Sequence, residues 1–523
     1  MSEKAKIARA TGIMGAATAC SRVAGLARDM VVARWFGVGF ATDAFFMAYT
    51  IPNLLRQFFA EGSLTAAFVP TFSEVYVKRG PEEGRRVANI CWTLLTVLMV
   101  AICLAGVLAS PLVVRVIGYG FGAVPGKLEL TDFLNRLMFP YLFFVSLLAL
   151  ASGILNVLGH YFTPSFSTVL LNLAMIGCAL VLGPLFQVPI TALAVGVLLG
   201  GLLQLLLQVP GLRARGFLPR PDFHFGDPAV RRIARLMLPG IVGVAIYQIN
   251  VVVSRLLASF LPQGSVSYLY YGQRLFEFPT GIFVVSLAQA VLPAMSRQAA
   301  LDDKVGFKES LRFALVLIVL VTVPAAVGLA LCAIPIYSLF FMNRTFTIQD
   351  VLQTGRVLAV YAPGLMFVGV SRVIVPTFYA MKDTRTPVKV SFVTLLVNIS
   401  LGLLLMGPLK HVGLALAVSL SSMFNATVLL WLLRRRIGTL GLTRIGGSLL
   451  RILPALLAMA LVVHLLLGLT DWRQPAMMVE KGLVLTAAVA VGGLVFLFGC
   501  LALGVEEVRD VVRMLRRRLT RTA

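Results

Sequence analysis

The chain of 523 residues consists largely of long apolar segments separated by short polar stretches. A helix needs about 20 mostly apolar residues to cross the hydrocarbon core of a bilayer. That core offers no water to backbone N–H and C=O groups, so only helices and closed barrels can cross it. Hydrophobic residues make up 59% of the sequence. These observations predict an all-α polytopic membrane protein.

Fourteen segments are long enough to span a membrane: residues 8–36, 42–77, 87–118, 131–158, 163–184, 189–212, 235–261, 266–296, 312–342, 351–381, 386–408, 412–433, 446–470 and 480–504. About 30 Lys and Arg lie in the two termini and one set of alternate loops, and about five lie in the other set, an excess that marks the cytoplasmic side. An even number of spans puts both termini on that side. The net charge of +24 therefore reflects membrane topology, and no nucleic-acid partner is expected.

The sequence also contains an internal repeat. Three pairs of prolines with similar flanking residues share one spacing of 223 residues: Pro70 with Pro293, Pro140 with Pro363, and Pro164 with Pro387. The repeat predicts two pseudo-symmetric six-helix lobes of parallel topology, with the substrate between them and two extra helices at the C-terminus. The expected parts are an N-lobe (1–212), an amphipathic linker (213–234), a C-lobe (235–436), spans thirteen and fourteen (437–505) and a basic tail (506–523).

Arginines such as Arg34 and Arg255 lie toward the ends of predicted spans, where they can reach the interface. Four others stand out as intramembrane charges: Arg22, Arg28, Arg56 and Arg274. A charge at the bilayer centre costs at least about 2.5 kcal/mol, so such residues are functional by default. The planar guanidinium binds two phosphate oxygens at once and stays charged when buried. The set therefore favours a negatively charged substrate, although structural pairing within the protein is the alternative.

Acidic residues lie near these arginines: Asp29, Asp43, Glu61 and Glu277. They either hold the arginines in place or carry a coupling proton or cation. Arg274 and Glu277 are three residues apart on one helix, which is close enough to pair. Pro52 and Pro279 lie beside these charges and are expected to kink their helices. Kinks next to charges suggest helices that move.

Sequence motifs for enzymes and metal sites are missing. The chain has no P-loop, HExxH or GxSxG motif, which argues against an enzyme and against ATP-driven transport. Its six cysteines show no ligand spacing, so neither a zinc site nor a disulfide framework is expected. No cofactor is expected. The energy would come from a coupling cation (Na⁺ or H⁺), the membrane potential or consumption of the product.

Four stretches resemble one known family: SRVAGLARDMVVARWFG (21–37), ATDAFFMAYTIPNLLRQFFAEGSLTAAFVP (41–70), YGQRLFEFPTGIF (271–283) and FYAMKDTRTPVK (378–389). By these the chain resembles the MurJ (MviN) family of lipid II flippases, within the multidrug/oligosaccharidyl-lipid/polysaccharide (MOP) exporter superfamily, whose lobes are MATE-like. The resemblance implies alternating access that moves lipid II from the inner to the outer leaflet of the bacterial cytoplasmic membrane.

The same resemblance implies roles for individual residues. Arg22, Arg28, Arg56 and Arg274 would line a central cavity and bind the pyrophosphate. The resemblance also implies that Asp43 is important. With it, Ser21, Asp29, Glu61 and Glu277 are our expected supporting or ion-coupling residues. Spans thirteen and fourteen would form a groove for the polyprenyl tail. The expected partners are lipid II, membrane phospholipids and the peptidoglycan synthesis machinery.

Three other functions stay open at this point. One is a MATE-like drug or cation antiporter, which would have a cavity rich in carboxylates and aromatic side chains. Another is a flippase for a different lipid-linked oligosaccharide. The third is a scaffold for cell-wall enzymes, in which the intramembrane charges would be dispensable.

Overall fold

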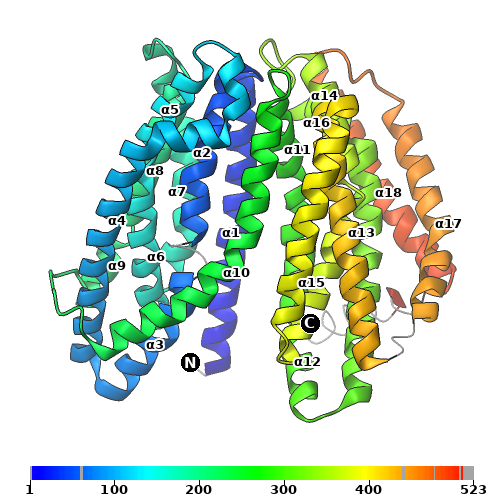
Figure 1. Ribbon diagram of the computed structural model, residues 1–523. Coiled ribbons are helices and arrows are strands. Elements are labelled where there is room, and N and C mark those ends of the chain that lie inside the picture. The colour runs from blue at the N-terminus through cyan, green and yellow to red at the C-terminus, as the bar shows by residue number, and fades with distance from the viewer. Residues whose placement is uncertain (1–2, 59–62, 439–441, 476, 506–507, 510–523) are drawn as a thin grey trace. The chain divides into compact units, whose positions relative to one another are not determined.

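The computed structural model describes residues 3–58, 63–438, 442–475, 477–505 and 508–509. The described residues form helices and connecting turns, without any strand. Contacts between residues divide the chain into two compact units, unit 1 (Met1–Ser267) and unit 2 (Tyr268–Ala523). Within each unit the long helices run side by side (Figure 1). The predicted all-α class is confirmed.

Unit 1 contains ten α-helices and the beginning of an eleventh, within the described residues: α1 Glu3–Phe36, α2 Phe40–Arg56, α3 Ser63–Arg79, α4 Pro81–Ile117, α5 Lys127–Met138, α6 Tyr141–Val157, α7 Phe162–Val181, α8 Thr191–Leu206, α9 Val209–Ala214, α10 Pro228–Ser259 and α11 Ser265–Pro279. Local sequence explains where such helices begin. Gly80 has a φ of 88° before α4, and Pro81 follows in the first helical position, where its missing N–H costs nothing.

Unit 2 contains the rest of α11, a π-helical segment Thr280–Val284, and the helices α12 Val285–Ala300, α13 Lys304–Phe340, α14 Ile348–Tyr361, α15 Gly364–Ala380, α16 Arg385–Ile437, α17 Leu442–Leu467 and α18 Met478–Ala502. The N-cap of α13 is Asp303, whose carboxylate accepts a hydrogen bond from Gly306 N at 2.9 Å. Such an N-cap satisfies one of the free N–H groups of the first turn.

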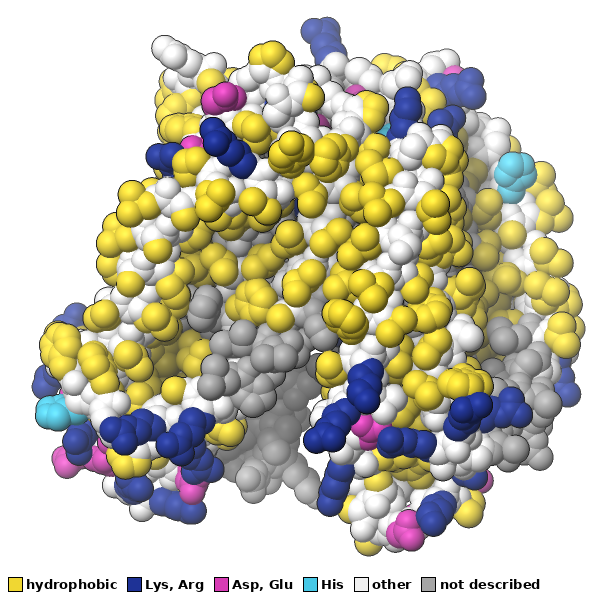
Figure 2. Space-filling model, in the orientation of Figure 1, with side chains coloured by type: hydrophobic (Ala, Val, Ile, Leu, Met, Phe, Trp, Pro, Cys, Tyr) yellow, Lys and Arg dark blue, Asp and Glu magenta, His cyan; other side chains and the backbone are white. Residues whose placement is uncertain are grey.

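Large apolar side chains cover the outside of the helices. On α4, Leu104, Leu108 and Leu112 are 61%, 79% and 67% exposed. Figure 2 shows hydrophobic side chains over the middle of the helices. A soluble protein rarely exposes apolar patches of this extent. Eight helices of the described chain are long and apolar enough to cross a membrane, or nine if α14 and α15, bent by 41°, form one span. The protein is therefore multi-pass, while the count of fourteen spans stays a prediction.

The 53-residue helix α16 is a hairpin of two helical halves. Lys410 lies between them with φ 51° and ψ −133°, which is not helical. Asn425 Nδ2 donates to Thr394 Oγ1 at 3.1 Å, and Ser421 Oγ donates to Asn398 Oδ1 at 3.4 Å. The contact partner in the second half shifts from 425 back to 421 as the first half advances from 394 to 398, so the two halves run antiparallel. The break lies in the gap predicted between spans 386–408 and 412–433.

The internal repeat is visible in the helix bounds. Helix α4 (Pro81–Ile117) corresponds to α13 (Lys304–Phe340), and α6 (Tyr141–Val157) corresponds to α15 (Gly364–Ala380). Each bound lies 223 residues from its counterpart. The prolines also keep their roles, since Pro140 and Pro363 are the N-caps of α6 and α15. These matches support a duplication, while the lobe and linker boundaries expected from the sequence stay predictions.

Candidate functional site

The side chain of Arg28 lies on α1 and is held by its neighbour and by α7. It is 3% exposed. Its Nε and Nη2 donate to Asp29 Oδ1 at 3.0 and 2.7 Å, and its Nη1 donates to Asn172 Oδ1 at 3.1 Å. Asp29 is 4% exposed. A buried charge needs such partners, and Asp29 supplies one for Arg28, while its expected role as a supporting or ion-coupling residue stays a prediction.

Arg22 lies on the same helix, six residues before Arg28. A rise of about 1.5 Å per residue separates the two by roughly 9 Å along the axis. Arg22 is half-buried, and no ion pair or hydrogen bond joins its guanidinium to the described residues. The backbone carbonyl of the adjacent Ser21 accepts from Asn172 Nδ2 at 3.3 Å. Asn172 therefore contacts both ends of this arginine-bearing stretch.

Arg56 is the last residue of α2 and is partly buried. Its Nε and Nη2 donate to Asn53 Oδ1 at 3.2 and 3.0 Å. Gln57 and Phe58, which follow, are π-helical. The π-helical segment of unit 2 begins at Thr280, 223 residues after Gln57. Such segments are rare and occur often at functional sites. Glu61 lies outside the described residues.

Arg274 lies in unit 2, on α11, and pairs with Glu277 as predicted. Its Nη1 is 3.4 Å from Glu277 Oε2, and its guanidinium carbon is 5.7 Å from the centre of the Tyr270 ring. Gln273 Nε2 donates to Glu277 Oε1 at 3.0 Å. The Arg274 and Glu277 side chains are 41% and 44% exposed. Glu277 therefore orients Arg274 without enclosing it.

Asp43 lies in the first turn of α2 and is the centre of a buried cluster in unit 1. It is 1% exposed. Lys127 Nζ donates to its Oδ2 at 3.0 Å, as does Gly264 N at 2.7 Å. Ser267 donates to its Oδ1 through both N, at 2.9 Å, and Oγ, at 2.7 Å. One carboxylate therefore joins the beginnings of α2, α5 and α11.

Sequence reasoning missed Lys127, Asn172 and Ser267. Lys127 is 2% exposed, and its Nζ lies 4.2 Å from the centre of the Phe121 ring. In the sequence it looks like an ordinary loop lysine, 84 residues from Asp43. Its position directly after a Gly-rich turn was the only local signal. No group of three or more His, Cys, Asp or Glu that could hold a metal occurs within the described residues.

Comparison with known proteins shows the family to which the chain belongs. The family model for "Lipid II flippase MurJ" matches residues 32–480. The chain belongs to the MurJ family. The match extends from the end of α1 into α18, so it includes Arg56, Arg274 and the Asp43 cluster. The resemblance seen in the four sequence stretches is confirmed.

Individual MurJ relatives cover most of the chain. A protein of Vibrio cholerae, "Probable lipid II flippase MurJ", is 39% identical over 424 residues, which are 80% of this chain and 81% of the relative. "Lipid II flippase MurJ" of Burkholderia cenocepacia is 34% identical over 459 residues, 87% of this chain and 88% of the relative.

Solved structures agree with the family assignment. The structure titled "Lipid II flippase MurJ, inward closed conformation" has a TM-score of 0.75 at 27% identity and covers 92% of this chain and 98% of that one. An inward-facing multidrug resistance MATE family transporter of the MOP superfamily has a TM-score of 0.68 at 15% identity, over 80% and 95% of the two chains. The second likeness shows the fold alone, which is MATE-like as expected.

Proposed function

We propose that this chain is a transporter that moves lipid II from the inner to the outer leaflet of the bacterial cytoplasmic membrane. The observation that carries the proposal is the MurJ family match over residues 32–480. The apolar outer surface of the helices supports a multi-pass membrane location. The excess of Lys and Arg in alternate loops supports cytoplasmic termini.

The pyrophosphate of lipid II is the anion that the arginines would bind. Arg22 is the first candidate for direct contact, because it is half-buried and its guanidinium has no partner within the described residues. Arg28 is already paired with Asp29 and Asn172. Through these contacts it would hold the helix stretch that carries Arg22 in place. A guanidinium can bind two phosphate oxygens at once.

Arg56 and Arg274 would complete the set. Both lie on helices that lead into π-helical segments, at Gln57 and Thr280. A π-helical turn departs from the regular hydrogen-bond ladder, which makes it a place where a helix can bend. We therefore expect these two arginines to move during alternating access, so that they face one leaflet and then the other. Glu277 would keep Arg274 oriented while no substrate is bound.

The energy source would be a cation gradient or the membrane potential. Asp43 has four hydrogen-bond donors around its carboxylate. These donors hold the carboxylate in place, so of the two roles expected for Asp43 we assign it the supporting one. Asp43 would therefore support the fold of unit 1, and the negative charge of the substrate itself would couple transport to a potential that is positive outside.

The experiment is complementation of a bacterium depleted of its own lipid II flippase. Labelled lipid II in the outer leaflet is measured after expression of this chain. Wild-type protein should restore growth and outer-leaflet lipid II, whereas Arg22→Ala should not. Arg231→Ala removes an exposed arginine of α10 and should behave like wild type. Failure of the inserted wild-type protein to restore outer-leaflet lipid II would contradict the proposed function.

A further inference from the structure

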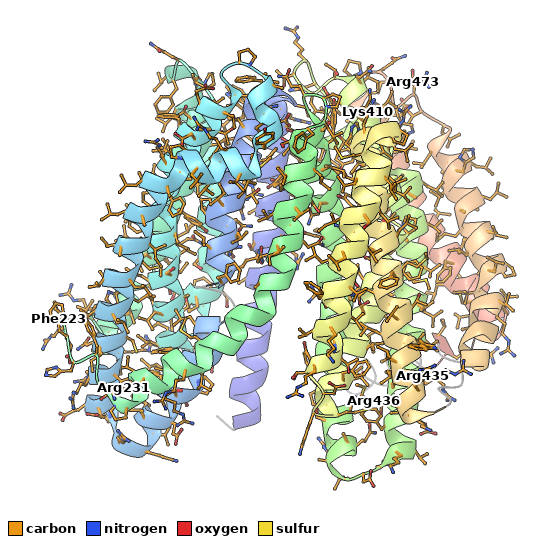
Figure 3. The ribbon with its side chains drawn as sticks, viewed as in Figure 1. Phe223, Arg231, Lys410, Arg435, Arg436 and Arg473 are labelled. Carbon is orange, nitrogen blue, oxygen red and sulfur yellow. The ribbon has the colours of Figure 1, made fainter. Side chains whose placement is uncertain are left out.

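A cavity of about 370 Å³ lies at one end of unit 2, away from Arg274. It is bounded by the turn between α12 and α13, the turn between α15 and α16, and the end of α16. Figure 3 labels Arg435 and Arg436 at this end. Ligand pockets in proteins have volumes of roughly 300 to 1,000 Å³. The cavity is large enough for a polar headgroup.

Four cationic side chains from three segments line the cavity: Lys304, Lys308, Lys382 and Arg436. Arg436 Nη1 lies 2.7 Å from Asp383 Oδ2, and Lys304 Nζ lies 3.8 Å from Asp302 Oδ1. The ammonium groups of Lys308 and Lys382 make no ion pair or hydrogen bond with residues that the structure describes. The carboxylates of Asp302 and Asp303 also line the cavity, so Lys308 and Lys382 are its two cations without an ion pair among the described residues.

The cavity also has an apolar wall and an unsatisfied acceptor. Phe307, which is 6% exposed, and Met381 supply apolar surface. Gln298 Oε1 is buried and accepts no hydrogen bond from the described part of the chain. A buried amide oxygen without a donor costs about 1 to 3 kcal/mol. A ligand that carries a hydroxyl beside its negative charge would satisfy this oxygen.

We propose that this cavity binds the headgroup of an anionic phospholipid whose phosphodiester carries a hydroxylated group, as in phosphatidylglycerol. The phosphate lies between Lys308 and Lys382, and a headgroup hydroxyl donates to Gln298 Oε1. The glycerol ester region packs against Phe307 and Met381. The ligand therefore matches the cations, the acceptor and the apolar wall together.

The position of the cavity favours a lipid over a soluble phosphate ester. It lies where α13 begins and α16 ends. Both helices are apolar enough to span the membrane. Figure 2 shows basic side chains at this end of unit 2, beside a band of apolar side chains. Headgroups occupy this level of a bilayer, and basic pockets between helices on the cytoplasmic side bind anionic headgroups. The inference does not depend on which substrate the chain transports.

The test uses purified full-length protein in a non-ionic detergent, titrated with dioleoyl phosphatidylglycerol, and native mass spectrometry counts the bound lipids. Lys308→Gln/Lys382→Gln removes the charges of these two lysines. Arg213→Gln/Arg231→Gln removes the same charge from exposed positions of unit 1. Gln298→Leu removes the acceptor. Each variant is first compared with wild type by its thermal unfolding midpoint.

The lysine double variant should bind the first phosphatidylglycerol at least tenfold more weakly, since each surface cation contributes about fivefold. The arginine control should change the affinity less than twofold. Gln298→Leu should bind phosphatidylglycerol no more tightly than phosphatidic acid, which lacks the headgroup hydroxyls. Wild type should bind phosphatidylcholine at least tenfold more weakly than phosphatidylglycerol.

Equal affinity of wild type and the lysine double variant for phosphatidylglycerol would overturn the proposal. Equal affinity of wild type for phosphatidylglycerol and phosphatidylcholine would overturn it as well. Glycerol 1-phosphate in millimolar excess should leave the lipid bound. Complete displacement at micromolar concentration would assign the site to a soluble phosphate ester and would overturn the lipid as its ligand. If the lysine double variant unfolds, the Gln298→Leu variant decides the test. A preference for phosphatidylglycerol over phosphatidic acid that is the same as in wild type would then overturn the proposal.

Discussion

Lys127 Nζ lies 3.0 Å from Asp43 Oδ2, and the side chains of both residues are at most 2% exposed. The pair joins α5 to α2, and the same carboxylate accepts from Gly264 and Ser267 at the beginning of α11. Removing one partner of a buried ion pair leaves an uncompensated charge and costs about 3 to 5 kcal/mol. Removing either charge alone is therefore expected to destabilise unit 1.

Lys127→Met should lower the free energy of unfolding by about 3 kcal/mol or more, because Asp43 would stay buried without its cation. Thermal or denaturant unfolding of the detergent-purified protein measures the change. The control is Lys78→Met, since Lys78 pairs with Glu74 at 2.9 Å but is 70% exposed. Such a pair contributes at most about 1 kcal/mol. A Lys127→Met protein as stable as this control would refute the anchoring role of Asp43.

Asn172→Leu should destabilise the protein by about 1 to 3 kcal/mol, because Arg28 Nη1 would lose its acceptor on α7 in a buried setting. It should also slow flipping, since Arg28 and Ser21 would lose the contact that holds this part of α1. The measurement pairs an unfolding curve with a flipping rate in proteoliposomes. Asn172→Asp keeps an acceptor for Arg28 Nη1, so it should retain more of the stability and of the flipping rate than Asn172→Leu does. An unaltered flipping rate in Asn172→Leu would show that α7 does not position Arg28.

Glu277→Gln should leave stability within about 0.5 kcal/mol of wild type, because the Arg274–Glu277 pair is well exposed. It should nevertheless slow flipping if Glu277 orients Arg274 toward substrate. A double-mutant cycle with Arg274→Ala separates the two effects. In that cycle the losses in flipping should be non-additive, whereas strictly additive losses would mean that the residues act independently.

Lys481→Met should loosen the attachment of α18 to α13. Lys481 is 1% exposed, and its Nζ donates to Ser338 Oγ at 3.0 Å and to the Gln474 carbonyl. Ser338 Oγ in turn donates to the Trp472 carbonyl at 2.6 Å. Hydrogen exchange should show faster exchange in residues 468–475, with α4 unchanged as the internal reference. Equal exchange in wild type and variant would contradict this assignment.

The local features of the fold could be read from the sequence. The 223-residue spacing of prolines predicted helix bounds that recur at the same spacing, as in α6 and α15. The interval around Lys410 predicted the turn inside α16. Arg274 and Glu277 were paired from their spacing on one helix. Each of these rests on residues close in sequence or on a regular period.

The contacts between distant residues could not be predicted. Lys127 lies 84 residues from Asp43, and Asn172 lies 144 residues from Arg28. Neither pair leaves a periodic or local pattern, because the contact is set by how helices pack. The burial of Lys127 also contradicts the usual exposure of lysine. A buried ion pair of this kind is visible only when the helices are in place.

Arg22 is the residue proposed to bind the pyrophosphate of lipid II. The most direct measurement is the rate at which labelled lipid II is flipped in proteoliposomes containing Arg22→Ala, Arg22→Lys or wild-type protein at equal amounts. Loss of a charge-assisted bidentate contact, about 1.5 to 3 kcal/mol, predicts a rate at least tenfold lower for Arg22→Ala and a smaller loss for Arg22→Lys. A correctly inserted Arg22→Ala protein that flips lipid II at the wild-type rate would contradict the claim.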